Sequence, residues 1–256
     1  MNASTTQDNT LRELINLGEA LLMNGAEVNR VEDTLIRMGK AAGAESINVF
    51  VITSDIVATI RYPDGSEITQ TRRINHSASV NFDVIEKLNA LSREFCISPI
   101  SDSELHERIE SILASKPRTP AKYAGNIIAA VAFAVFFGGG FAECVAAAVA
   151  ALIIAFLSHK VAPYLKNTII FNFSAAFILG IFLTVSSHFF PIFDCPKAFS
   201  GALMLLIPGV AITNSVRDML VGDTMSGILH LIESVLWAGA IVVGYVLAAY
   251  LTEVIL

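Results

Sequence analysis

A succession of long apolar segments fills the second half of the chain and constrains its fold more than any other feature. The segments cover approximately residues 121–138, 141–158, 167–188, 198–213 and 228–251. Each is close to the about 20 residues that a helix needs to cross about 30 Å of hydrocarbon, although the second and fourth are short. Apolar residues make up 54% of the whole chain, which is high for a soluble domain. The pattern predicts an all-α membrane bundle of about five transmembrane helices.

Charged residues are concentrated before this region. Ten basic and seventeen acidic residues lie at or before Ser115, and seven basic and six acidic residues follow it. We therefore expect a soluble, acidic domain over residues 1–115 and a transmembrane domain over residues 116–256. The net charge of −6 argues against a nucleic-acid partner.

The first 115 residues predict a cytoplasmic α+β domain. A capping box at Thr10 to Glu13 predicts the start of a first helix. The turn signal Pro63-Asp64-Gly65 separates two short β-type runs. The full expected order is a helix from Thr10, a helix over Ala26–Ala42, strands over Ile47–Thr53, Ile56–Tyr62 and Glu67–Ile74, and helices over Asn81–Phe95 and Ser103–Ser115. This is a helix pair, a small antiparallel sheet and a second helix pair.

Two groups of charged residues in this domain allow a functional and a structural interpretation. They are the acidic and basic residues Glu27, Arg30, Glu32 and Asp33, and the basic edge formed by Arg72, Arg73 and His76. Either group can belong to an anion-binding or regulatory site, or to a solvated helix face and a charged edge strand. We favour the solvated interpretation. Because phosphate-loop, metal-ligand and nucleophile motifs are missing from the sequence, we predict no enzymatic activity, cofactor or metal.

The distribution of Lys and Arg predicts the orientation of the membrane domain. One side of the membrane would hold Lys116, Arg118, Lys122, Lys160, Lys166 and Arg217, and the other side would hold Lys197. Since cytoplasmic loops are richer in Lys and Arg, residues 1–115 are expected in the cytoplasm of a multi-pass membrane protein. A fourth segment that re-enters instead of crossing would place the C-terminus on the cytoplasmic side as well.

A Pro-Gly pair interrupts the fourth apolar segment after Ile207, and polar residues follow from Thr213. Pro208 and Gly209 are expected to break the helix, and broken spans carrying polar groups are typical of transport sites. The segment after the break would direct a positive helix end toward an anion, and Arg217 would bind a carboxylate with two hydrogen bonds. In the alternative interpretation, these charges solvate a cytoplasmic turn.

Polar residues inside the apolar segments are further candidates for the transport pathway. Each costs about 2.5–3.5 kcal/mol at the centre of a membrane helix. Glu143 either serves the pathway or reaches water near the loop before it. The candidate substrate pathway consists of Pro208, Gly209, Thr213, Asn214, Arg217, Asp218, Asp223, Glu233, Asn126 and Asn172, with Asp218, Asp223 or Glu233 as carriers of a coupling proton.

Small residues recur every four positions in two of the apolar segments. They are Ala142, Ala146 and Ala150 in one segment, and Ala240, Gly244 and Ala248 in the other. Such spacing lets helix backbones approach closely in lipid. It predicts a packed bundle or an oligomer.

Two stretches resemble the threonine/serine exporter family. The residues Pro208-Gly209, Thr213 to Asp223 and Ser226-Gly227 resemble the signature of that family, and the stretch Asn24 to Asp33 resembles its N-terminal helix pair. The similarity covers the whole chain. It implies a bacterial inner-membrane exporter of small amino acids.

The chain resembles one half of this family in particular. Single-chain members have two unlike membrane halves, and this sequence resembles the larger subunit of a split, two-component form that is associated with succinate export. The resemblance implies a second, smaller membrane subunit of the same family as a partner, in a homo- or hetero-oligomer within the lipid bilayer. Both candidate cargoes, threonine/serine-type amino acids and succinate-type dicarboxylates, carry carboxylates, in agreement with the role expected of Arg217.

Two other classes of protein compete with an exporter subunit. One is a membrane-anchored regulatory or scaffold protein whose cytoplasmic domain binds a partner, although an anchor has no need for polar residues inside its spans. The other is an intramembrane enzyme. We rank the enzyme last because His159, His188 and His230 are expected at different depths.

Overall fold

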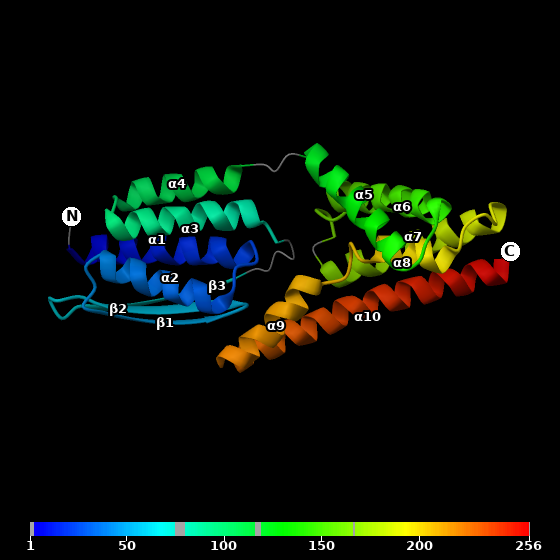
Figure 1. Cartoon of the computed structure of the whole chain (residues 1–256). Coiled ribbons are helices and arrows are strands. Elements are labelled where there is room, and N and C mark those ends of the chain that lie inside the picture. Colours follow the sequence, from blue (N-terminus) through cyan, green and yellow to red (C-terminus); the bar gives the residue numbers. More distant parts are fainter. Residues whose placement is uncertain (1–2, 75–79, 116–118, 166, 256) are drawn as a thin grey trace. The chain divides into compact units, whose positions relative to one another are not determined.

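The computed structural model describes residues 3–74, 80–115, 119–165 and 167–255 (Figure 1). Within these ranges the helices are α1 (Ala3–Met23), α2 (Val28–Ala41), α3 (Phe82–Ile97), α4 (Asp102–Ala114), α5 (Thr119–Phe136), α6 (Phe141–Lys160), α7 (Thr168–Phe189), α8 (Cys195–Leu203), α9 (Gly209–Val221) and α10 (Thr224–Ile255), and the strands are β1 (Ser46–Ile52), β2 (Asp55–Arg61) and β3 (Glu67–Arg73). The predicted linker residues Lys116, Pro117 and Arg118, as well as His76 and Lys166, lie outside the described residues.

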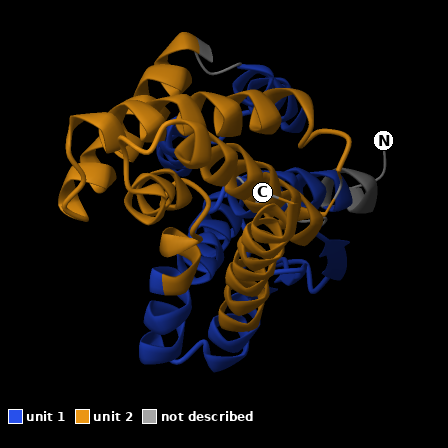
Figure 2. Cartoon of the chain, turned by 90° about the vertical axis from the view of Figure 1, so that its right-hand side faces the viewer, with its two compact units in different colours: residues 1–116, 213–230 blue, residues 117–212, 231–256 orange. Residues whose placement is uncertain are grey.

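The chain divides into two compact units that do not follow the order of the sequence. The first unit contains residues 1–116 and 213–230, and the second contains residues 117–212 and 231–256 (Figure 2). Most of α9 and the first two turns of α10 therefore belong to the same unit as the N-terminal helices.

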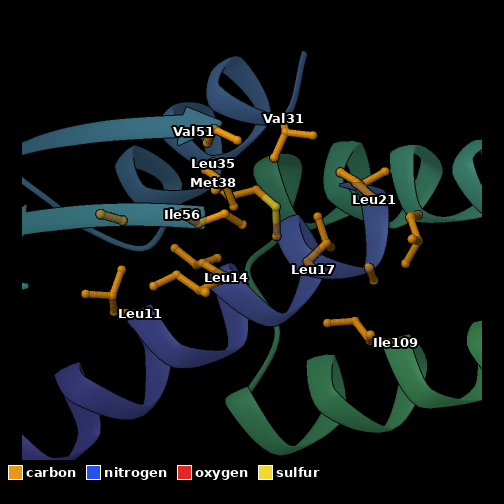
Figure 3. Packing of buried hydrophobic residues seen from close by; sticks show 14 of the residues in the cluster. Leu11, Leu14, Leu17, Leu21, Val31, Leu35, Met38, Val51, Ile56 and Ile109 are labelled. Atoms are coloured by element: carbon orange, nitrogen blue, oxygen red, sulfur yellow. The ribbon is translucent and has the colours of Figure 1, made fainter. Parts of the chain in front are cut away.

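Helix α1 lies at the centre of the first unit. It contacts α2, α3, α4 and strands β2 and β3. Its inward side chains, which recur three or four positions apart, are at most 1% exposed: Leu11, Leu14, Ile15, Leu17 and Leu21. Figure 3 shows the four leucines among them packed with Val31, Leu35 and Met38 of α2, Val51 of β1, Ile56 of β2 and Ile109 of α4. Burying one such side chain contributes about 1.5–3 kcal/mol, so this cluster holds the helices on the sheet.

The three strands form one small antiparallel sheet in the order β1-β2-β3. A two-residue connection sets the register of the first hairpin, where Ile52 pairs with Asp55. The second hairpin turns at Gly65, whose φ of +83° suits a glycine. Helices α1 and α2 contact the sheet, and the side chains of β3 are half-buried or exposed throughout. The observed strands differ by one residue from the predicted ones at most of their ends.

The predicted start of the first helix is wrong. Thr10 lies inside α1, which begins at Ala3. Its hydroxyl donates a hydrogen bond of 2.9 Å to Oδ1 of Asp102, at the start of α4. Thr10 therefore contributes to a contact between α1 and α4. The Thr-x-x-Glu pattern alone does not distinguish such a contact from a helix cap.

Close backbone contacts hold the second unit together. A Cβ atom on Gly201 of α8 would lie 2.8 Å from the carbonyl oxygen of Ala130 in α5. A Cβ atom on Gly244 of α10 would lie 2.5 Å from the carbonyl oxygen of Phe173 in α7. One turn further along α10, Ala248 is fully buried. The small-residue spacing of α10 thus marks its contact with α7, as the sequence predicts.

The prediction of an α+β domain followed by a bundle of five transmembrane helices is wrong. Among the described residues, the helices long and apolar enough to cross a membrane are α6, α7 and α10, and the apolar helix Pro120–Phe136 is shorter. The expected span over 198–213 is interrupted: α8 ends at Leu203 and α9 begins at Gly209. Pro208 prevents a helix from continuing into α9, because proline lacks the backbone donor, although α8 already ends at Leu203.

The prediction of an N-terminal α+β domain is also wrong. Helices predominate in both units, and the strands of the described residues form one three-stranded sheet. Segment 213–230, expected at the end of the membrane bundle, is helical and belongs to the N-terminal unit. A division into an α+β part followed by an all-α part therefore does not describe this chain.

Candidate functional site

A tight helical hairpin carries most of the charged residues expected in the transport pathway. Helix α9 ends at Val221, and α10 begins three residues later at Thr224. The backbone N–H of Asp223 donates to the carbonyl oxygen of Asp218 at 2.8 Å and closes the turn. Gly222 has a φ of +104°, a conformation that side chains rarely tolerate. The turn thus depends on glycine at this position.

The two helices of this hairpin touch through their backbones. A Cβ atom on Gly227 of α10 would lie 2.7 Å from the carbonyl oxygen of Ser215 and 3.0 Å from the backbone nitrogen of Met219, both in α9. Ser215 is fully buried and Ser226 is 2% exposed. Small side chains therefore set the spacing between the helices and fix the position of the charged residues on them.

Arg217 of α9 forms an ion pair with Glu27, the residue that precedes α2. Its Nη1 atom donates a hydrogen bond to Oε1 of Glu27. The Arg217 side chain is 56% exposed, and the Glu27 side chain is 22% exposed. The pair joins the two stretches of sequence that resemble the exporter family.

On the neighbouring face of α9, Asp218 faces α10. Asp218 is 2% exposed, and its Oδ2 lies 3.2 Å from Nδ1 of His230. Burial raises the pKa of the Asp218 carboxyl above its usual value of 3.8. The hydrogen bond and the charge of His230 oppose this rise of the pKa, and the charges of Asp223 and Glu27 add to it. Asp218 thus holds a proton to a higher pH than an exposed aspartate does.

Glu32 and Asp223 are two further carboxylates of the same unit. The backbone N–H of Val51 donates to Oε1 of Glu32 at 2.8 Å. Burial raises the pKa of Glu32, the bond from Val51 lowers it, and the charge of Asp223 raises it further. The Oδ2 atom of Asp223 is buried and lacks a hydrogen-bond partner within the described ranges. We refer to Glu27, Glu32, Arg217, Asp218, Asp223 and His230 together as the hairpin cluster.

The hairpin cluster contains four carboxylates, one guanidinium and one imidazole. A guanidinium binds carboxylates, and a buried carboxyl beside an imidazole exchanges protons. The described part of the chain contains no group of His, Cys, Asp and Glu residues placed to hold a metal ion. The side chains of the cluster are of the types that recognise anions and transfer protons in proteins.

The structure brings only part of the predicted pathway together. Arg217, Asp218 and Asp223 lie in the hairpin cluster, and Glu233 lies one turn beyond His230 on α10, half-buried. On α9, Thr213 is exposed and Asn214 is half-buried. Glu233 and the remaining predicted residues belong to the second unit: half-buried Asn126 on α5, Asn172 on α7 with 5% exposure, and Pro208-Gly209 before and at the start of α9.

The start of α9 and Arg217, which were expected to bind one anion together, lie about two turns apart on the same helix. Arg217 lies eight residues after Gly209, the first residue of α9. At 1.5 Å per residue, their backbones are about 12 Å apart along the axis. The Arg217 guanidinium pairs with Glu27 and not with a group at the start of α9, so Arg217 is considered by itself as the candidate for binding a carboxylate.

Glu143 has a structural role in the second unit. Its side chain accepts a hydrogen bond of 2.7 Å from the backbone N–H of Gly140, which caps α6. It accepts another of 2.8 Å from the N–H of Asp194, the residue before α8. The carboxylate thus fastens the loop before α8 to the start of α6.

The sequence did not single out Glu27 and Glu32 within their charged helix. The solvated interpretation fits Asp33, which is 64% exposed and pairs with Arg37 one turn away. It does not fit Glu27 and Glu32, which bond to α9 and β1. The available signal was the location of both residues in a stretch that resembles the exporter family.

Apolar helices of membrane-spanning length together with a charged, partly buried helical hairpin define an integral membrane protein of the transport class. The comparison with family models is specific: residues 12–252 match the family described as "Putative threonine/serine exporter". Since this match covers nearly the whole chain, the protein belongs to the threonine/serine exporter family. This confirms the resemblance seen in the sequence, and a transport role in place of an enzymatic one.

Two curated relatives carry the same name, "Probable succinate transporter subunit YjjP". The protein from Klebsiella aerogenes is 26% identical over 236 residues, which cover 89% of this chain and 88% of the relative. The protein from Escherichia coli strain K12 is 26% identical over 256 residues, which cover 93% and 92%. No solved structure matches the chain.

Proposed function

We propose that this chain is the larger subunit of a bacterial inner-membrane exporter for small metabolites that carry a carboxylate. It acts with a second, smaller membrane subunit. The printed names of the two relatives support this proposal, since both describe a subunit of a succinate transporter and match over about nine tenths of their lengths. The cargo class comprises succinate-type dicarboxylates and threonine/serine-type amino acids.

The observation that carries the proposal is the partner of Arg217. The exposed guanidinium of Arg217 binds the carboxylate of Glu27 at the surface of the helical hairpin. This contact supports Arg217 as the group that recognises the cargo carboxylate, since the side chain is oriented for such a partner and remains accessible.

The proton that couples export to an energy source is assigned to Asp218 and His230. Their side chains lie 3.2 Å apart, and Asp218 is almost fully buried. Burial also raises the pKa of the Asp218 carboxyl above its usual value. Asp223 and Glu233 are assigned to the same proton path on α10.

The proposed location follows from the distribution of charge. Residues 1–115 face the cytoplasm, because Lys and Arg residues concentrate around the start of the membrane domain at residue 116. Asn126, Asn172 and the Pro208-Gly209 break contribute to the pathway inside the membrane domain. The close α7–α10 contact supports a packed bundle, which associates further with its partner subunit.

Efflux from preloaded cells tests the proposal. Cells loaded with succinate or with a threonine-containing dipeptide are compared without the protein, with this chain alone, with the chain and its partner subunit, and with the pair carrying Arg217→Ala. We expect faster efflux of at least one cargo only with both subunits, and loss of that efflux in Arg217→Ala.

Arg93→Ala is the matched control, because it removes an exposed arginine of α3 outside the hairpin cluster. Membrane fractions must contain equal amounts of each variant. Unchanged efflux of both cargoes in every arrangement would refute the exporter assignment and favour the regulatory or scaffold alternative.

A further inference from the structure

Glu27 occupies a helix-capping position but does not cap its own helix. It immediately precedes α2 and has extended backbone angles, φ −69° and ψ 137°. Acidic side chains at this position usually bond to the free N–H groups of the first helical turn. The Glu27 side chain makes no such bond. Its carboxylate is directed to Arg217 instead, 190 positions away in the sequence.

The bond between Glu27 and Arg217 uses few of the N–H donors of the guanidinium. Nη1 of Arg217 reaches Oε1 of Glu27 in a single-point contact. A guanidinium can offer two parallel N–H donors to one carboxylate, and that geometry is stronger. Since the Arg217 side chain is also 56% exposed, the ion pair is open to competition by a carboxylate from solution.

The surroundings of Glu27 favour its release once Arg217 is occupied. Asp218 lies close enough for the two negative charges to repel each other, and Asp218 in turn experiences the charge of Asp223. Without Arg217, Glu27 would face these carboxylates uncompensated. Binding of another carboxylate to Arg217 is therefore expected to loosen the start of α2 from α9.

We propose that Glu27 is an internal substitute for the cargo carboxylate. It fills the binding position on Arg217 when cargo is absent, and cargo binds by exchange with it. The inference rests on the proposed function, because it assumes that Arg217 recognises the cargo. It adds a specificity rule: a cargo must present a carboxylate with both oxygens free, since only such a group binds better than the single-point contact of Glu27.

Transport into inverted membrane vesicles tests the exchange. The vesicles contain both subunits, and the uptake of labelled succinate or threonine is measured over a range of outside concentrations. Glu27→Gln removes the competing charge while keeping nearly the same shape. We expect the KM of the transported cargo to fall about two- to fivefold, the scale of an exposed ion pair, with little change in kcat. An unchanged or higher KM overturns the exchange.

Asp33→Asn is the matched control, because it removes a carboxylate from an exposed ion pair of the same helix. Its KM should equal that of the unmodified pair of subunits. A decrease equal to that of Glu27→Gln would show a general effect of charge on α2 and would also overturn the exchange.

A charge swap separates exchange from a structural role of the ion pair. The double variant Glu27→Arg with Arg217→Glu restores an ion pair between α2 and α9 but inverts the cargo-binding charge. We expect a thermally stable protein that does not transport, whereas restored transport would show that the pair is merely structural.

Failure of the exchange is distinguishable from failure of the proposed function. Full transport by Arg217→Ala refutes the proposed role of Arg217 itself. Loss of transport in Arg217→Ala together with an unchanged KM in Glu27→Gln refutes the exchange alone.

Discussion

Glu27 and Arg217 form an ion pair that joins the start of α2 to the middle of α9. The pair connects a residue near the N-terminus to the helix that follows the Pro208-Gly209 break. The pair lies beside the buried Asp218–His230 contact, so the residues proposed for anion recognition and for proton exchange are adjacent on α9. Two adjacent residues of α9 thus present a cation on its exposed side and an acid on its buried side.

Asp218→Asn is expected to abolish proton coupling while preserving the packing of the hairpin. The amide has the size of the carboxylate, and it still pairs with Nδ1 of His230 at the same distance, but it cannot carry the proton. Because burial raises the pKa of Asp218, transport by the unmodified protein should change with pH above the usual aspartate value of 3.8. We expect the variant to transport about 100-fold more slowly, the scale of a lost proton-transfer group, and to lose this pH dependence.

The measurement is cargo uptake by inverted vesicles between pH 5 and pH 8, with equal amounts of protein. Asp33→Asn serves as the control because it lies outside the hairpin cluster. A variant with the rate and pH profile of the unmodified protein would exclude Asp218 from the proton path.

Glu32→Gln is expected to stabilise the protein at neutral pH and to have no effect in acid. Burial raises the pKa of Glu32 in the folded state above its unfolded value of 4.5. A carboxyl of this kind contributes stability at pH values below 4.5 and loses that contribution as the pH rises through the folded-state pKa. Glutamine keeps the acceptor for the N–H of Val51 and removes the charge, which faces Asp223.

The gain in stability at pH 7 should be less than about 1 kcal/mol, because the side chain is partly exposed and solvent screens it. Thermal unfolding in detergent at pH 7 and at pH 4 measures the difference. Glu86→Gln, at an exposed position of α3, provides the control. A larger gain at pH 4 than at pH 7 would contradict the assignment of burial as the cause.

The local elements of the N-terminal unit could be read from the sequence because they depend on neighbouring residues. The turn at Pro63-Asp64-Gly65 and the alternation around it located β2 and β3 to within one residue. The predicted helix over Ser103–Ser115 also lies within one residue of α4 at both ends, and the hydroxyl of Ser101 before it accepts from the N–H of Glu104. Each of these sequence patterns consists of residues that lie within a few positions of one another.

The long-range relationships could not be predicted in the same way. Pro208-Gly209 predicted a break within the apolar segment 198–213, but hydropathy did not show that the helix before it would already end at Leu203. No local pattern pairs Glu27 with Arg217, since an ion pair between distant segments leaves no periodic trace in the sequence. Arg217, Asp218 and Asp223 lie together on the α9–α10 hairpin, but the sequence did not predict the partner of each side chain.

Gly222→Ala is expected to destabilise the α9–α10 hairpin by about 1–2 kcal/mol. The φ of +104° at this position is costly for a residue with a Cβ atom, although space around the site is open. The shift of the unfolding midpoint in detergent measures the cost. Gly125→Ala in α5 is the control, since its surroundings are equally open and its φ is not positive. Equal midpoints for the two variants would show that the turn tolerates a side chain.

Gly244→Leu is expected to separate α10 from α7. A Cβ atom there would lie 2.5 Å from the carbonyl oxygen of Phe173 and 3.2 Å from the backbone nitrogen of Phe177, so backbone atoms would have to move. In lipid, close packing is the main source of helix association, and losing it leaves little to replace it. Overpacking of this kind costs about 1–3 kcal/mol or more.

Gly239→Leu is the matched control for this prediction, because it adds the same side chain to the same helix where no atom lies within 4 Å. We expect Gly244→Leu to lower the unfolding midpoint in detergent and the amount of protein in the membrane, and Gly239→Leu to leave both nearly unchanged. If instead Gly239→Leu is the more damaging of the two, the open face of α10 at Gly239 is covered in the assembled protein. The α7–α10 contact would then be the less important interface of this helix.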